Sequence, residues 1–359
     1  MTRRYLRNCR WPLVFGRWQN RYELNFFWPR RLPQQRGDNG RVLANDQQPT
    51  TNDRPVARLH LPVWLRPPAK HQRQAFALQF LPLYVVVAVL LFLVLSTGIS
   101  YLLPAGTPRL WGALLAKAIL AFAMTVPALA ISRIEGRPFG DFGLPAAHAF
   151  GKLFWLGVLW GLCFLSALLF ILRVAGTLSY GSVALHGEHI WKLATFWAIF
   201  FLCVAVFEEF TFRGYTQFAI QQVAGFWPAA LLLSAIFAYI HHSNPGETWF
   251  GTLGAGAVAL FFCFTLRRTG NLWFAVGMHA AWDWAQSFFY GVPDSGVVEP
   301  GHLLQASLHG PAWLTGGTVG PEGSVLLFAL IAVMWFVFDR MFPANTISPR
   351  RHGDTEKSA

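Results

Sequence analysis

Long apolar runs separated by short polar segments dominate the sequence after about residue 75. A membrane-spanning helix needs about 20 apolar residues, and eight runs come close to or exceed this length. They cover about residues 80–103, 111–132, 152–174, 189–221, 227–242, 248–266, 271–290 and 323–340. The pattern predicts an all-α protein, a polytopic transmembrane helical bundle of about eight spans.

Two of these runs depart from the usual length of a span. The run 189–221 is long enough to break into two helices. The run 227–242 is short, so we expect it to be tilted or sheltered by its neighbours. Gly251, Gly254 and Gly256 fall in the next run, where small residues let helices approach closely, and we interpret them as packing positions.

The composition indicates that lipid, and not water alone, surrounds the chain. Charged residues make up only 13% of the 359 residues, and 54% are hydrophobic. A soluble globular protein carries about 25% charged residues, so this chain has too few charges to coat a soluble surface of its size. The composition excludes a soluble globular protein and favours lipid as the surroundings of much of the chain.

Nearly all of the net charge of +12 lies at the N-terminus, because residues 1–73 hold fifteen Lys and Arg against four acids. We therefore predict a basic cytoplasmic N-terminal extension (1–75), a transmembrane domain (76–342) and a polar C-terminal tail (343–359). The extension could bind nucleic acid through its basic, tryptophan-containing surface. We prefer an anchor that touches anionic lipid headgroups, because the segment abuts a span.

The loop charges can be compared with the positive-inside rule, by which cytoplasmic loops are rich in Lys and Arg. With eight spans, the two termini share one side of the membrane. That side would also hold Arg133, Arg137, Lys152, Arg267, Arg268, Arg340, Arg350 and Arg351, and the other side only Arg109, Arg173 and Lys192. Both termini are therefore predicted to be cytoplasmic. The loop 291–322 is then external, with Asp294, Glu299, Glu322 and no Lys or Arg.

Ionisable residues inside apolar spans are costly and usually functional or paired. Lys117 lies near a span end and can reach the interface; the others form three groups. In the first, Glu209 and Arg213 are four residues apart and share a helix face, whereas Glu208 points about 100° away. Glu208 is a candidate general base. The alternative is a structural ion-pair network.

The second and third groups contain histidines. His241 ends a short apolar run four residues after Phe237, and it either faces the same cavity as Glu208 or caps the helix end. His279 and Asp283 are four residues apart, and they either serve a site or form a buried hydrogen bond. Because lipid does not solvate polar groups, such groups converge on one another or on water. A shared cavity with these groups has the parts needed for hydrolysis.

The three motifs together resemble the CAAX protease and bacteriocin-processing family, also called the abortive-infection family. The motifs are E-E-x-x-x-R (Glu208, Glu209, Arg213), F-x-x-x-H (Phe237, His241) and H-x-x-x-D/N (His279, Asp283). The resemblance covers about residues 130–290. It implies hydrolysis of a peptide bond in a membrane-embedded substrate, such as a prenylated C-terminus, a bacteriocin leader or a membrane-protein segment. It also implies an integral protein of the bacterial inner membrane.

The resemblance implies a role for each site residue. Glu208 would activate water with help from His241, and His279 with Asp283 would bind the developing oxyanion or orient the groups that do. The third motif ends here in Asp, which the family tolerates in place of Asn. A carboxylate donates a hydrogen bond only when it is protonated, so Asp283 differs in chemistry from the amide form.

The remaining two residues, Glu209 and Arg213, would hold the site together. The family is often described as metalloproteases, and zinc could be bound by Glu208, Glu209, His241 and His279. The sequence has no H-E-x-x-H motif, and the two histidines come from different predicted helices. We therefore prefer a metal-free glutamate mechanism that requires no cofactor, with zinc as the open alternative.

Two further functions use the same residues. A non-catalytic immunity or scaffolding protein would sequester a partner, although no position of the family pattern is missing here. A transporter would use the buried acids and histidines as a proton relay. It would usually show inverted repeats, and the sequence shows no internal repeat.

Overall fold

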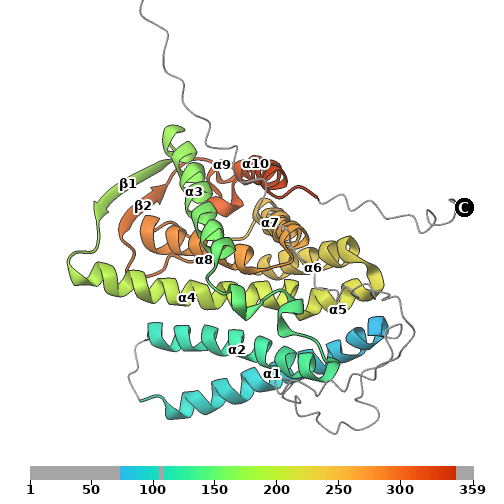
Figure 1. Cartoon of the computed structure of the whole chain (residues 1–359). Coiled ribbons are helices and arrows are strands. Elements are labelled where there is room, and N and C mark those ends of the chain that lie inside the picture. The colour runs from blue at the N-terminus through green and yellow to red at the C-terminus, as the bar shows by residue number, and fades with distance from the viewer. Residues whose placement is uncertain (1–72, 105–108, 345–359) are drawn as a thin grey trace, which may run out of the picture. The chain divides into compact units, whose positions relative to one another are not determined.

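The computed structural model describes residues 73–104 and 109–344 of the chain (Figure 1). The predicted N-terminal extension and C-terminal tail fall almost wholly outside these ranges. The α-helices are α1 Arg73–Leu102, α2 Arg109–Glu135, α3 Lys152–Val174, α4 Glu188–Arg213, α5 Tyr215–Ala224, α6 Phe226–His241, α7 Trp249–Thr269, α8 Trp273–Trp284, α9 Ala312–Thr315 and α10 Leu326–Met341. Two short strands are β1 Leu178–Val183 and β2 Leu304–Leu308. Single turns of other helix types are η3 Phe139–Phe142, η4 Ala146–His148, η5 Ala285–Tyr290 and η6 Pro321–Gly323.

Five helical segments within the described ranges are long and apolar enough to cross a membrane. They are Ala77–Leu102, Arg109–Glu135, Lys152–Val174, Glu188–Ala224 and Trp249–Thr269. The helices α6, α8 and α10 have 16, 12 and 16 residues, and a straight helix of that length is shorter than the hydrocarbon core. The all-α membrane bundle is confirmed, and the number of about eight spans stays a prediction.

The long fourth run breaks into two helices, as its length predicted. α4 ends at Arg213 and α5 begins at Tyr215, with Gly214 between them at φ −82° and ψ −123°. A Cβ atom at Gly214 would lie 2.4 Å from the carbonyl oxygen of Phe210. The break therefore needs a residue without a side chain, and it separates the site-bearing α4 from α5.

The helix α4 lies between α2 and α8, and α8 packs in turn against α3. Glycines set the distance between α3 and α8. A Cβ at Gly157 would lie 2.1 Å from the oxygen of Phe274, and one at Gly277 would lie 2.2 Å from the oxygen of Phe154. The two backbones touch directly, as small residues allow in membrane bundles, and this contact positions α8.

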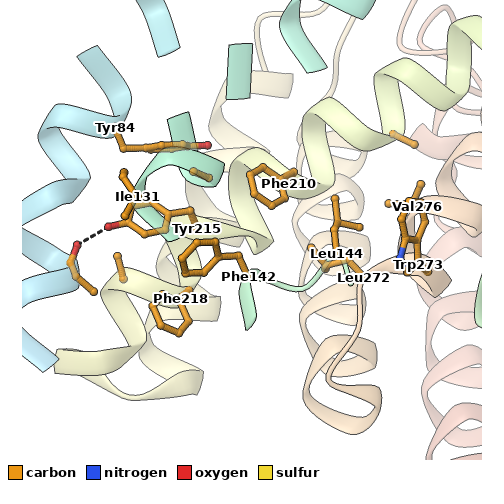
Figure 2. Packing of buried hydrophobic residues seen from close by; sticks show 14 of the residues in the cluster. Tyr84, Ile131, Phe142, Leu144, Phe210, Tyr215, Phe218, Leu272, Trp273 and Val276 are labelled. Atoms are coloured by element: carbon orange, nitrogen blue, oxygen red, sulfur yellow. Dashed lines mark hydrogen bonds between the residues drawn. The ribbon is translucent and has the colours of Figure 1, made fainter. Parts of the chain in front are cut away.

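A buried aromatic cluster holds the end of α4 in place (Figure 2). Phe210 and Tyr215 are fully buried in it on either side of the Gly214 break. Rings of Phe142 and Tyr215 meet edge to face with their centroids 5.0 Å apart. The Tyr215 hydroxyl donates a hydrogen bond of 2.9 Å to the carbonyl of Ala77, which ties α5 to α1. The cluster therefore fixes the rotation of α4 immediately after its two glutamates.

A two-stranded antiparallel sheet joins distant loops, and the sequence pattern did not predict it. β1 pairs with β2 in the register Leu178↔Leu308, Ser179↔Ser307 and Tyr180↔Ala306, with an irregularity before Val183↔Leu304. β1 follows α3, and β2 lies in the acidic loop 291–322. The sheet thus fastens that loop to the segment after α3.

Candidate active site

The last two turns of α4 bring two adjacent glutamates into different surroundings. Glu209 is fully buried, and its Oε1 lies 3.3 Å from Nη1 of Arg213, one helical turn later. The Glu208 side chain remains 18% exposed. One residue of helix rotates the chain by about 100°, so only one of the two carboxylates can face Arg213. The geometry agrees with the pairing predicted from the spacing.

Phe237 on α6 joins the arginine to the histidine of its own motif. The guanidinium of Arg213 lies over the Phe237 ring, 4.6 Å from its centroid, in a cation–π arrangement. The same ring stacks on the imidazole of His241, with centroids 4.1 Å apart. The first position of F-x-x-x-H therefore carries an aromatic ring that packs between α4 and the end of α6.

His279 on α8 lies among three carboxylates. Its Nδ1 is 2.9 Å from Oε1 of Glu209, and its Nε2 is 3.3 Å from Asp283 and 3.8 Å from Glu208. A carboxylate oxygen accepts, so with Glu209 ionised the Nδ1 atom carries the proton and donates it. The imidazole of His279 thus lies between the buried Glu209 on its Nδ1 side and the partly exposed Glu208 and Asp283 on its Nε2 side.

His241 makes a single local hydrogen bond. Its Nδ1 lies 2.9 Å from the carbonyl oxygen of Phe237, and a carbonyl only accepts, so Nδ1 is the protonated nitrogen. In the neutral ring the lone pair is then on Nε2, where it can take a proton from water. His241 therefore bonds a carbonyl of its own helix and also lines a cavity with Glu208.

A cavity of about 320 Å³ collects these side chains. We call it the active-site cavity. It is lined by Glu208 of α4, His241 of α6, and His279 and Asp283 of α8, with apolar side chains of α4 and α7 around them. Glu209 and Arg213 do not line it; they lie behind its wall, joined to it through His279. The structure thus brings all six predicted site residues into one connected group.

Four further carboxylates line the same cavity, and motif spacing alone did not find them. They are Glu247 before α7, Asp294 after η5, Glu299 in the segment before β2, and Glu322 in η6. Asp294 accepts a hydrogen bond of 2.8 Å from the hydroxyl of Ser287, and Glu322 accepts one from the backbone of Ser295. For the three in the loop 291–322, the available signal was the absence of Lys and Arg from that acidic loop.

Burial and mutual repulsion raise the pKa values of Asp294 and Glu322. Burial, together with the charges of Asp283 and Glu247, raises the pKa of Glu322 to about 8, although hydrogen bonds from Ser295 act in the opposite direction. The pKa of Asp294 lies well above its usual range, first through burial and then through Asp283 and Glu322. The cavity can therefore hold protons on its loop side near neutral pH.

Lys117 also lines the active-site cavity, at the end where Glu299 lies. Burial raises the pKa of Glu299, while the charges of Lys117 and Arg109 lower it. Its position near a span end had suggested a lysine that reaches the membrane interface. The structure also places its side chain in the wall of the cavity, where its positive charge favours the ionised form of Glu299.

The geometry does not favour the zinc site that the sequence left open. In residues 73–104 and 109–344, no three His, Cys, Asp or Glu side chains are grouped so that they could hold a metal ion. Glu209, one of the four suggested ligands, is sealed behind the wall and is already engaged by Arg213 and His279.

The helices and the cavity define a class: a polytopic helical membrane protein with a carboxylate and histidine site between its helices. Residues 190–285 match the family described as type II CAAX prenyl endopeptidase Rce1-like. The matched segment runs from the first turn of α4 to the end of α8, and the match agrees with the resemblance to the CAAX protease and bacteriocin-processing family that the motifs indicated. Neither the curated proteins nor the solved structures gave a match.

Proposed function

We propose that this protein is an intramembrane endopeptidase that cleaves a membrane-associated peptide with a water molecule activated by Glu208 and His241. One observation carries the proposal: these two side chains, from different helices, line the same cavity as His279 and Asp283. The family match supports a CAAX-type protease. A prenylated C-terminus or a leader peptide is the substrate that this class of enzyme would take.

In the proposed reaction, the Glu208 carboxylate takes a proton from water while Nε2 of His241 orients that water. The hydroxide attacks the scissile carbonyl carbon. His279 in its imidazolium form donates from Nε2 to the developing oxyanion, and preorganised donors of this kind supply a large part of catalysis. Glu208 then returns the proton to the leaving amine as the C–N bond breaks.

Glu209, Arg213 and Asp283 are positioning residues in this scheme. Glu209 accepts from His279 at 2.9 Å and holds the ring in one orientation. Arg213 neutralises the buried Glu209 and packs on Phe237. Asp283, 3.3 Å from Nε2 of His279, stabilises the charged ring. Their arrangement favours acid–base chemistry over a simple ion-pair network, because Glu208 and His241 remain available to the cavity.

The test uses the full chain in lipid vesicles and an internally quenched, farnesylated peptide ending in a CAAX sequence. Glu208→Gln and His241→Ala should each lower kcat by about 10²–10⁴, the usual contribution of a general base. Glu188→Gln is the matched control, because Glu188 lies on the same helix and is exposed with Lys192.

Cleavage at the wild-type rate by folded Glu208→Gln protein would contradict the proposal. If that variant also kept a cellular immunity phenotype, the non-catalytic alternative would explain it. Thermal unfolding of each variant shows whether lost cleavage reflects lost chemistry or lost fold.

A further inference from the structure

A second cavity lies behind the buried ion pair and shares no lining residue with the active-site cavity. Its volume is about 400 Å³, and we call it the arginine cavity. Its polar lining side chains are Asp141, Arg213, Gln217, Gln221, Gln222 and Arg267. The proposed hydrolysis makes no use of this space, so its polar lining calls for a separate explanation.

Two buried donors in its wall have no hydrogen-bond partner. Arg213 is 2% exposed and Gln217 is fully buried, yet Nη2 of Arg213 and Nε2 of Gln217 are both unsatisfied. Arg213 uses Nη1 for Glu209, and Gln217 uses Oε1 to accept from the thiol of Cys263. The Cys263 thiol also interacts with Arg213 but leaves Nη2 unsatisfied. Leaving such donors buried and unmet is costly, so an acceptor in the cavity would stabilise the fold.

The mouth of the cavity adds a positive charge. The exposed Arg267 at the end of α7 lies over the ring of Phe226, 5.0 Å from its centroid. Asp141 is the only acid among the described lining side chains, and it is exposed. The positive charge of Arg137 lies close enough to offset its negative charge. The lining therefore offers two guanidinium groups and amide donors, which is the chemistry that binds an oxyanion.

The backbone beside the cavity also favours binding of an oxyanion. α5 begins beside the cavity at Gly214, and no side chain caps that end. A helix N-terminus presents free N–H groups and a positive dipole end, both of which favour phosphate. The cavity also lies where the apolar helix α7 ends in Arg267 and Arg268, and basic side chains at the end of a span can attract anionic lipid headgroups.

We propose that the arginine cavity binds a phosphate group, with Arg213 Nη2, Gln217 Nε2 and Arg267 as its donors. A phospholipid headgroup or free phosphate carries this group. Arg213 also pairs with Glu209 in the proposed reaction, through its other terminal nitrogen. Binding of phosphate is measured without cleavage, so it can be tested apart from the protease activity.

The experiment measures the thermal unfolding midpoint of the full chain in neutral detergent. One arm adds phosphatidylglycerol against phosphatidylcholine, and the other adds inorganic phosphate against chloride at equal ionic strength. Binding at ten times the dissociation constant should raise the midpoint by about 2 °C, and the rise should saturate. A rise with lipid alone identifies a headgroup site, and a rise with inorganic phosphate identifies a free-phosphate site; both support the proposal.

Variants separate this site from general surface charge. Gln217→Glu places a carboxylate where the oxyanion would bind, and Arg267→Gln removes the charge at the mouth; each should abolish the rise. Arg340→Gln is the matched control, since Arg340 also lies over a phenylalanine, Phe336, at the end of a helix, and it should keep the rise. The proposal is wrong if neither probe shifts the wild type, if both cavity variants respond as the wild type does, or if the control also loses the response.

Discussion

Glu208 and Glu209 are adjacent on α4 but differ in burial and in the groups that they contact. Glu209 is fully buried, and the same oxygen faces Arg213 and His279, whereas Glu208 borders the active-site cavity. A buried charge without a partner is expensive in a low-dielectric interior. The structure therefore predicts different losses of stability when each glutamate is replaced by glutamine.

Glu209→Gln should destabilise the protein by about 3–5 kcal/mol, because it leaves Arg213 as an unpaired buried charge. Glu208→Gln should change stability by less than about 1 kcal/mol, since its side chain borders a cavity. Unfolding in detergent with increasing denaturant measures both. Equal stability of the two variants would show that the Glu209–Arg213 pair does not support the fold.

The sequence predicted contacts between individual residues where those contacts follow helical spacing. The pairs Glu209–Arg213 and His279–Asp283 were predicted because residues four apart meet on any helix. The hydrogen bond between His279 and Glu209 spans 70 residues of sequence. No local spacing encodes it, because it depends on how α4 and α8 pack.

Among the elements, α8 is placed by direct backbone contact with α3 as well as by packed side chains. The sequence predicted packing positions at Gly251, Gly254 and Gly256, and a Cβ at Gly256 would indeed lie 3.2 Å from the Cβ of Ala238. The backbones of α3 and α8 approach each other more closely, at Gly157 and Gly277. Which helices meet at a glycine is a tertiary property, so sequence alone did not single out this pair.

Gly277→Ala should lower kcat at least tenfold, because the added methyl would lie 2.2 Å from the oxygen of Phe154 and push α8 and His279 away from α4. A misplacement of about 1 Å can cost about a hundredfold in rate. Peptide cleavage in vesicles measures the effect. Gly112→Ala on α2 is the control, since nothing lies within 4 Å of its Cβ position. Normal activity of Gly277→Ala would show that α8 tolerates the shift.

For the whole molecule, the apolar runs predicted the helices well, because period and length are local properties of the chain. The strands β1 and β2 were missed because they pair across more than 120 residues. The carboxylates Glu247 and Glu322 were missed as site residues for the same reason: they lie in loops that only the complete fold brings to the cavity.

The loop carboxylates predict a pH dependence of stability. The pKa of Glu322 is raised from 4.5 to about 8, so between these values the folded state binds more protons than the unfolded state. Stability therefore falls as pH rises from about 5 to 8. Glu322→Gln should flatten this slope, whereas Glu188→Gln should not. Unfolding midpoints across this pH range measure it, and a slope unchanged in Glu322→Gln would contradict the assignment.

Gln286, in the π-helical turn η5 that continues α8, uses both ends of its amide. Its Oε1 accepts from the indole of Trp282 at 2.8 Å, and its Nε2 donates to the carbonyl of Pro293 at 2.7 Å. The loop bearing Asp294 is thereby clamped to the helix bearing His279. A displacement of this loop would therefore also pull on the helix that carries His279.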